Sequence, residues 1–308
     1  MTSSRRLLVA AGTLVALLAL AGAGIAYFAN RVVDPADASC GHPSSILGTE
    51  RNAGDHQERE VHFRCAGASL GGTIYLPTSS GRDAAVVWVH GAGEAMRLTW
   101  GGQLLPGLVS AGVVVLSYDK RGVGESEGEC CPGDTGHFNL LTADAEGAVA
   151  VLRSLPEVDP ARVGLIGGSQ AGWIAPRAAV ASHAAFLALA SAPTVPERTA
   201  NLYERLSAGE EGSLSRQQIA ARLREEGPQG YDPEPDIAAM TMPGLWEFGT
   251  KDDRTPFEES VSVLRPLQAR GHDFTVLTFP AGHGLLDIPP SDPESTPALI
   301  DWVLHHDG

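Results

Sequence analysis

Basic residues are scarce in this sequence of 308 residues: Lys and Arg total 22 against 37 Asp and Glu, for a formal net charge of −15. A nucleic-acid-binding protein normally presents a basic face, so this balance excludes nucleic acid as the expected partner. The chain also lacks internal repeats and the composition of a disordered, collagen-like or coiled-coil protein, since 43% of its residues are hydrophobic and 19% charged. What remains is a globular chain, long enough for one large domain or two small ones.

Cysteine is rare as well. The four cysteines are Cys40, Cys65, Cys130 and Cys131. None belongs to a C-x-x-C pair or has a histidine at ligand spacing beside it, so no metal site is predicted. An oxidising compartment would permit disulfides among them, with three possible connectivities that the sequence leaves open.

One long uncharged run, from Leu7 to Asn30, follows Arg5 and Arg6. It is longer than the roughly 20 residues needed to cross a bilayer, and the basic pair predicts that the start stays in the cytoplasm while the rest crosses. Residues 1–30 are therefore expected to be either a cleaved signal peptide, cut near Ala21-Gly22-Ala23, or an uncleaved anchor, which the apolar residues beyond that site favour. In both cases the protein is expected to be exported, either secreted or held at the cell membrane with the rest of the chain outside.

The rest of the chain divides into a linker and a regular domain. Residues 31–59 are polar and rich in turn-forming residues, which is typical of a linker. From residue 60 onward, short apolar or β-branched runs alternate with segments of helical spacing after two or three opening strands. This pattern predicts an α/β domain over residues 60–308, with a mostly parallel sheet and helices on both faces. A charged, proline-rich region at about 193–242 is expected to be a partly helical insertion, either a lid or a surface excursion.

The individual elements can be placed from the same patterns. Eight runs are expected to be strands: 61–64, 72–76, 84–90, 113–118, 162–166, 185–190, 244–248 and 274–279. Apolar residues recur at helical spacing over 140–155, 169–182, 257–270 and 296–305. This placement puts each of the following motifs at the end of a strand.

A Gly-x-Ser-x-small motif surrounds Ser169, between the apolar strand from Val163 and a helix-compatible stretch. A nucleophile on a sharp strand-to-helix turn needs little side-chain bulk two residues before and two after it, and Gly167 and Ala171 meet that need. Such a turn would hold the hydroxyl at the edge of the sheet beside a helix N-terminus. The strict motif has glycine where Ala171 stands. Ser169 is the predicted nucleophile.

Two further motifs follow later strands. His283 lies in a glycine-rich turn after the last strand, where a loop histidine can act as a general base. Asp252 follows the preceding strand and is the predicted orienting acid, with Asp253 as the competing candidate; either could instead cap the next helix. Together with Ser169 these residues predict a triad of nucleophile, acid and base.

An oxyanion hole has its own candidate segment. The apolar strand Val86–Val89 ends in the small residues of His90–Gly93, which would let a backbone amide approach a developing oxyanion. We predict that the amides of Ala92 and Gln170 form this hole. The charged loop Tyr118–Ser126 closes another strand and is interpreted as a structural loop near the site.

Together these motifs resemble the α/β-hydrolase superfamily, specifically its exported dienelactone-hydrolase-like and prolyl-oligopeptidase-like branch. The similarity covers roughly residues 60–305. It rests on His90–Gly93, Tyr118–Ser126, Gly167–Trp173, Asp252 and Gly282–Gly284. The resemblance implies a triad in the chain order Ser169, Asp252, His283 on an eight-stranded sheet, with no cofactor. Related members cleave esters, thioesters, lactones and peptides, so the substrate does not carry over.

The leading hypothesis is a serine hydrolase acting on a small-molecule acyl substrate, with a carboxylic ester favoured. His283 would take the proton of Ser169 as it attacks the carbonyl, Asp252 would hold the imidazole, and water would release the acyl-enzyme. The enzymatic alternatives are a thioesterase and a prolyl-oligopeptidase-type peptidase, whose large propeller domain does not fit the short segment before residue 60. A non-catalytic binding protein with the same fold is a further alternative, against which an intact triad argues.

Overall fold

The computed structural model describes residues 38–78, 83–97, 102–131, 135–286 and 292–306. The predicted signal peptide or anchor, residues 1–30, lies outside these ranges, as do the first residues of the predicted linker. Within the described ranges no helix has both the length and the apolar character that crossing a bilayer requires.

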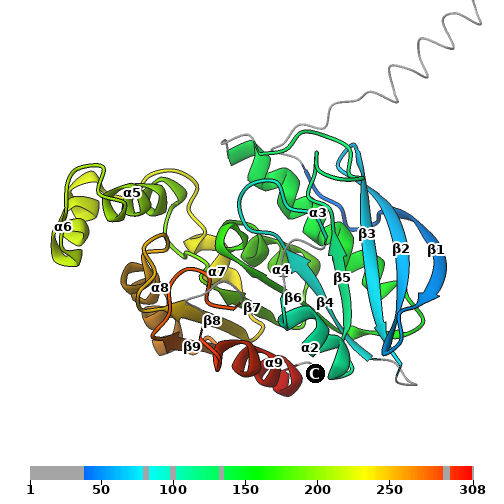
Figure 1. The fold of residues 1–308 in the computed structure, drawn as a ribbon. Helices are drawn as coiled ribbons and strands as arrows, with labels where there is room; N and C mark the ends of the chain where they lie inside the picture. Colours follow the sequence, from blue (N-terminus) through cyan, green and yellow to red (C-terminus); the bar gives the residue numbers. More distant parts are fainter. Residues whose placement is uncertain (1–37, 79–82, 98–101, 132–134, 287–291, 307–308) are drawn as a thin grey trace, which may run out of the picture. The chain divides into compact units, whose positions relative to one another are not determined.

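A nine-stranded sheet runs through the domain in the order β1-β2-β3-β5-β4-β6-β7-β8-β9 (Figure 1). The strands are β1 (Ser44–Asn52), β2 (His56–Cys65), β3 (Ala68–Pro77), β4 (Asp83–Val89), β5 (Val114–Tyr118), β6 (Val158–Gly168), β7 (Leu187–Ala190), β8 (Gly244–Gly249) and β9 (Phe274–Phe279). Antiparallel pairing joins β1 to β2, β2 to β3 and β3 to β5, and all other neighbours are parallel. The predicted mostly parallel sheet is confirmed, with the eight predicted strands appearing as β2 to β9.

Strand β1 corrects two expectations. The sheet has nine strands rather than eight, and the prediction of a linker over residues 31–59 is wrong from Ser44 onward. The chain there pairs with β2, from Ser44 opposite Arg64 to Asn52 opposite Gln57. Every residue of β1 is exposed, so the strand lacks the alternation of apolar and polar side chains by which a half-buried strand is recognised. Backbone pairing at the sheet edge places it instead.

Helices cover both faces of the sheet, as predicted. They are α2 (Leu104–Ser110), α3 (Thr135–Arg153), η2 (Ser169–Trp173), α4 (Ala175–Ser182), α5 (Glu197–Ser207), α6 (Arg216–Glu226), α7 (Glu234–Ala239), α8 (Phe257–Ala269) and α9 (Ser295–His306). Buried residues of α3, α4, α7 and α8 belong to one apolar core, whereas those of α2 and α9 belong to the core on the other face. Helix α2 was not anticipated, because its seven residues include Pro106 and Gly107, which disfavour a helix interior.

The parallel strands bring six segments to one edge of the sheet. Strands β5, β4, β6, β7, β8 and β9 are consecutive parallel neighbours, so their carboxyl ends lie side by side, where ligands bind in open α/β sheets. The segments that follow them begin at Asp119, His90, Ser169, Ser191, Thr250 and Pro280. Three of the six contain the predicted triad residues.

The predicted insertion at 193–242 consists of α5, α6 and α7. Tyr203 and Leu206 of α5 form a small apolar cluster with Ile219 and Leu223 of α6, and in Figure 1 this helix pair extends away from the sheet. Ile237 of α7 is instead fully buried in the main core. The insertion is therefore partly helical, as expected, and its last helix is part of the domain's packing.

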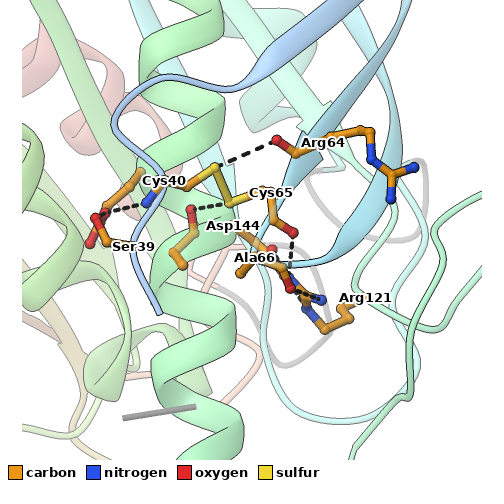
Figure 2. The surroundings of a disulfide bond; sticks show 9 residues. Ser39, Cys40, Arg64, Cys65, Ala66, Arg121 and Asp144 are labelled. Carbon is orange, nitrogen blue, oxygen red and sulfur yellow. Dashed lines mark hydrogen bonds and ion pairs between the residues drawn. A yellow bond between two sulfur atoms is a disulfide. The ribbon is translucent and has the colours of Figure 1, made fainter. Parts of the chain in front are cut away.

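A disulfide joins Cys40, before β1, to Cys65 at the end of β2 (Figure 2). Both residues are buried, and Cys65 Sγ lies 2.9 Å from the carbonyl oxygen of Ala143 in α3. The Cys40 amide donates a 3.1 Å hydrogen bond to Glu146 in the same helix. Cys130 and its neighbour Cys131 form the second disulfide, so one of the three possible connectivities is selected.

Replacing Cys40 and Cys65 together by alanine should lower the free energy of unfolding. The sequence separation is 25, and closing a loop of this size restricts the unfolded chain enough to contribute about 3 kcal/mol. Urea unfolding of the purified variants measures the loss. The double alanine substitution at Cys130 and Cys131 is the matched control, because a link between neighbours closes almost no loop. An equal loss in both variants would contradict this account.

Candidate active site

Ser169 occupies a sharp turn between β6 and η2. Its backbone has φ +54°, a left-handed conformation that an L-residue adopts only where the surroundings enforce it. A Cβ atom at Gly167 would lie 2.5 Å from the carbonyl oxygen of Val89, and one at Gly172 would lie 2.3 Å from that of Pro193. Both positions therefore require glycine. Ala171 fits as it stands, fully buried beneath the turn.

The structure brings the three predicted triad residues together. His283 Nε2 lies 3.1 Å from Ser169 Oγ, and its Nδ1 lies 3.0 Å from Asp252 Oδ2 and 3.2 Å from Oδ1. The Asp252 side chain is 1% exposed and that of His283 is 13% exposed. A hydroxyl, an imidazole and a buried carboxylate are thus linked in the order that proton transfer from serine requires.

The carboxylate of Asp252 is fixed by its own loop. Its Oδ1 accepts hydrogen bonds of 2.8 Å from the amides of both Arg254 and Thr255. Asp253, the competing candidate for the acid, is exposed, and the carboxylate that meets His283 belongs to Asp252. The amide contacts leave Oδ2 facing the imidazole, an orientation that the sequence does not reveal.

The insertion reaches this acid-bearing loop. The hydroxyl of Tyr203 in α5 donates a 2.9 Å hydrogen bond to the carbonyl oxygen of Asp252. Arg254 forms a 2.7 Å ion pair with Glu204 of α5, and Arg216 of α6 donates to the carbonyl oxygen of Thr250. The insertion was expected to be a lid or a surface excursion. These contacts indicate a third role, because they fix the loop that carries Asp252.

A small cavity of about 40 Å³ opens beside the nucleophile. It is lined by Trp88, Gly91, Gly168, Ser169, Ala190, Ser191, His283, Gly284, Leu285 and Leu286. The described lining side chains are mostly apolar, and none of them carries a carboxylate. Ser191 is a further polar residue that sequence reasoning missed: it has φ +49°, and its buried hydroxyl has no hydrogen-bond partner among the described residues.

The predicted oxyanion segment lies against the nucleophile turn. A Cβ atom at Gly91 would be 3.6 Å from the Cβ of Ser169. The Ala92 amide donates no hydrogen bond to another backbone group in the described part of the chain. His90, at the start of this segment, is buried, and its ring contacts the carbonyl oxygen of Tyr118. Burial, reinforced by Lys120, lowers the pKa of His90 to about 4, so the ring is neutral near pH 7.

Comparison with known proteins gives the same fold. Residues 80–225 match the family described as serine aminopeptidase, S33. The acylamino-acid-releasing enzyme of Arabidopsis thaliana is 24% identical over 74% of this chain, and the match spans 32% of that longer protein. This chain thus covers only about a third of that curated relative.

Solved structures of esterases are similar over most of the chain. Acetyl xylan esterase 1 from Thermoanaerobacterium superposes with a TM-score of 0.61 and 17% identity, covering 85% of this chain and 88% of that one. An esterase from Pyrococcus furiosus gives a TM-score of 0.60 at 17% identity, covering 87% and 92%. Together with the sheet order, this likeness shows that the chain has the α/β-hydrolase fold.

Proposed function

We propose that this protein is a serine esterase that hydrolyses short-chain carboxylic esters through an acyl-enzyme on Ser169. The observation that carries the proposal is the continuous set of contacts from Ser169 through His283 to the buried Asp252, placed at the mouth of a small, mainly apolar cavity. Labelling of the purified protein by a fluorophosphonate tests the nucleophile directly, because only an activated serine reacts.

Each residue has a distinct part in the proposed reaction. Ser169 Oγ attacks the ester carbonyl while His283 Nε2 accepts its proton, and the imidazolium is stabilised by Asp252. The amides of Ala92 and Gln170 donate to the oxyanion of the tetrahedral intermediate. His283 then gives the proton to the departing alkoxide. Water, activated by the same imidazole, attacks the acyl-enzyme and releases the carboxylic acid.

The cavity supports a short acyl group. One water-sized probe needs roughly 10–15 Å³ of such space, so a cavity of about 40 Å³ has room for a short group such as acetyl and not for a long alkyl chain. Two of the similar solved structures are acetyl xylan esterases by name. For this chain, these names only support the proposal of a short acyl group.

Peptide hydrolysis is the second candidate, favoured by the S33 family match and by the acylamino-acid-releasing relative. An aminopeptidase must bind the α-ammonium group of its substrate, for which a carboxylate is the usual partner. The described residues that line the cavity include no Asp or Glu. We therefore favour the ester, and p-nitroanilides of amino acids assayed beside p-nitrophenyl esters separate the two activities.

Among p-nitrophenyl esters, kcat/KM should be highest for acetate and fall with chain length beyond butyrate. Leu286→Ala should shift the preference toward longer chains, because it removes a half-buried side chain from the cavity wall, where a few methylenes discriminate by about 10–200-fold. Leu304→Ala, an exposed leucine on α9, is the matched control and should leave the profile unchanged. A preference for octanoate in the unmodified protein would refute the short-chain assignment.

A further inference from the structure

Lys120 is a buried cation that the proposed reaction does not yet use. It follows β5, in the loop interpreted as structural, and only 1% of the residue is exposed. Its Nζ donates hydrogen bonds of 2.9 Å to the carbonyl oxygen of Gly91, 3.1 Å to that of Gly93 and 2.7 Å to Oε1 of Gln170. All three N–H groups of the ammonium thus point at the two segments that carry the predicted oxyanion donors.

No carboxylate of the described residues offsets the charge of this ammonium. Among the described residues Lys120 has no ion pair, whereas the neighbouring Arg121 is paired with Asp144 (Figure 2). Burial of an unpaired ammonium is costly, and here it lowers the pKa of Lys120 to about 8. A lysine that served only to fill space would be replaced at lower cost by methionine. Its charge therefore has a use in this position.

The contact with Gly91 acts directly on a predicted donor. The carbonyl of Gly91 and the amide of Ala92 belong to one planar peptide unit. A cation on the carbonyl oxygen draws electron density from that unit and makes its N–H a stronger donor, an effect of about 10–30% per bond in hydrogen-bonded chains. Lys120 also binds the carbonyl oxygen of Gly93. The residues on both sides of Ala92 are therefore fixed by the same ammonium, which limits rotation of the Ala92 amide.

The geometry points to Lys120 as the positioning residue of the oxyanion hole: its ammonium locks the segment His90–Gly93 to Gln170 and strengthens the Ala92 amide when charge develops on the substrate oxygen. The positive charge itself also stabilises that oxyanion across the peptide. This inference rests on the proposed esterase function and identifies a residue through which it works. Lys120 acts through the peptide unit of Gly91 and Ala92 and through the side chain of Gln170, and does not touch the substrate.

Several charged or titratable residues lie near Lys120. Among them, the Lys120 ammonium is the group expected to lose its proton near pH 8. His90, directly after β4, is neutral because its burial and the nearby charge of Lys120 lower its pKa. Asp119 on the same loop directs its carboxylate to Arg97 and to the amides of Arg97 and Glu125. Glu94, in the segment after β4, is exposed.

The variant Lys120→Met keeps the length of the side chain and removes its charge and donors. With p-nitrophenyl acetate, kcat should fall about 10- to 100-fold, while KM changes less than twofold. This fall in kcat is no larger than the one that follows removal of a whole oxyanion donor. The inhibition constant of a trifluoromethyl ketone, which forms an oxyanion on Ser169, should rise by the same factor. Lys251→Met is the matched control, because it removes an exposed lysine beside the acid without touching the oxyanion segment.

The pH profile of the unmodified protein is a second measurement that needs no variant. The ammonium is the active form, so kcat should decline as the pH rises through about 8, and Lys251→Met should show the same decline while Lys120→Met lacks it. If Lys120→Met does not fold, this profile decides, and a constant kcat from about pH 7 to 9.5 overturns the inference. A kcat for Lys120→Met within threefold of the unmodified protein, or a loss of kcat with an unchanged ketone affinity, also overturns it. If the unmodified protein hydrolyses no ester at all, the proposed function fails instead.

Discussion

Ser169→Ala and His283→Ala should each lower kcat for p-nitrophenyl acetate by about 10⁴- to 10⁶-fold, and the double variant should be hardly slower than either. The 3.1 Å contact between Ser169 Oγ and His283 Nε2 makes the two side chains one unit. The hydroxyl is a weak nucleophile without the base, and the base has no proton to accept without the hydroxyl. Once one is removed, the other contributes nothing more.

Initial rates and thermal unfolding of the purified variants check this expectation together. Both side chains lie at strand ends with partial exposure, so thermal stability should hardly change. Ser262→Ala and His305→Ala, on exposed faces of α8 and α9, are controls that should retain full activity. Esterase activity in Ser169→Ala comparable to that of the unmodified protein would falsify the mechanism.

The sheet and the three residues at its edge were predictable because their signals are local. Each parallel strand is a short apolar run, and each of Ser169, Asp252 and His283 follows such a run within a few residues. Since parallel strands align their carboxyl ends, order along the chain was enough to predict proximity in space. The catalytic roles stay predictions until the variants are measured.

The features that escaped prediction either bury no apolar side chain or depend on contacts between distant segments. Strand β1 buries no side chain, so no periodicity marks it. The contact of Tyr203 with Asp252 links residues 49 positions apart, and that of Lys120 with Gln170 links residues 50 apart. A lysine in a charged loop after a strand gives no sign in the sequence that it will be buried among carbonyl oxygens. Only the packing of β4, β5 and β6 makes that contact.

Asp252→Asn should lower kcat by about ten-thousand-fold while Asp253→Asn changes it by less than about threefold. Because Oδ1 of Asp252 accepts the amides of Arg254 and Thr255, the asparagine oxygen must stay at that position. Its NH₂ group then replaces Oδ2, 3.0 Å from His283 Nδ1. The amide would donate to Nδ1 and leave the imidazole proton on Nε2, the tautomer that cannot accept the proton of Ser169.

The pair of isosteric substitutions distinguishes this mechanism from a general loss of negative charge. Each removes one carboxylate from the same loop, yet only Asp252 is buried against the imidazole, and Asp253 is exposed to solvent. The asparagine at 252 preserves the acceptor for both loop amides, so thermal unfolding should change little and the loss should appear in kcat. Equal losses in the two variants would indicate an effect of charge alone. A larger loss for Asp253→Asn would move the acid by one residue, contrary to the contacts of His283.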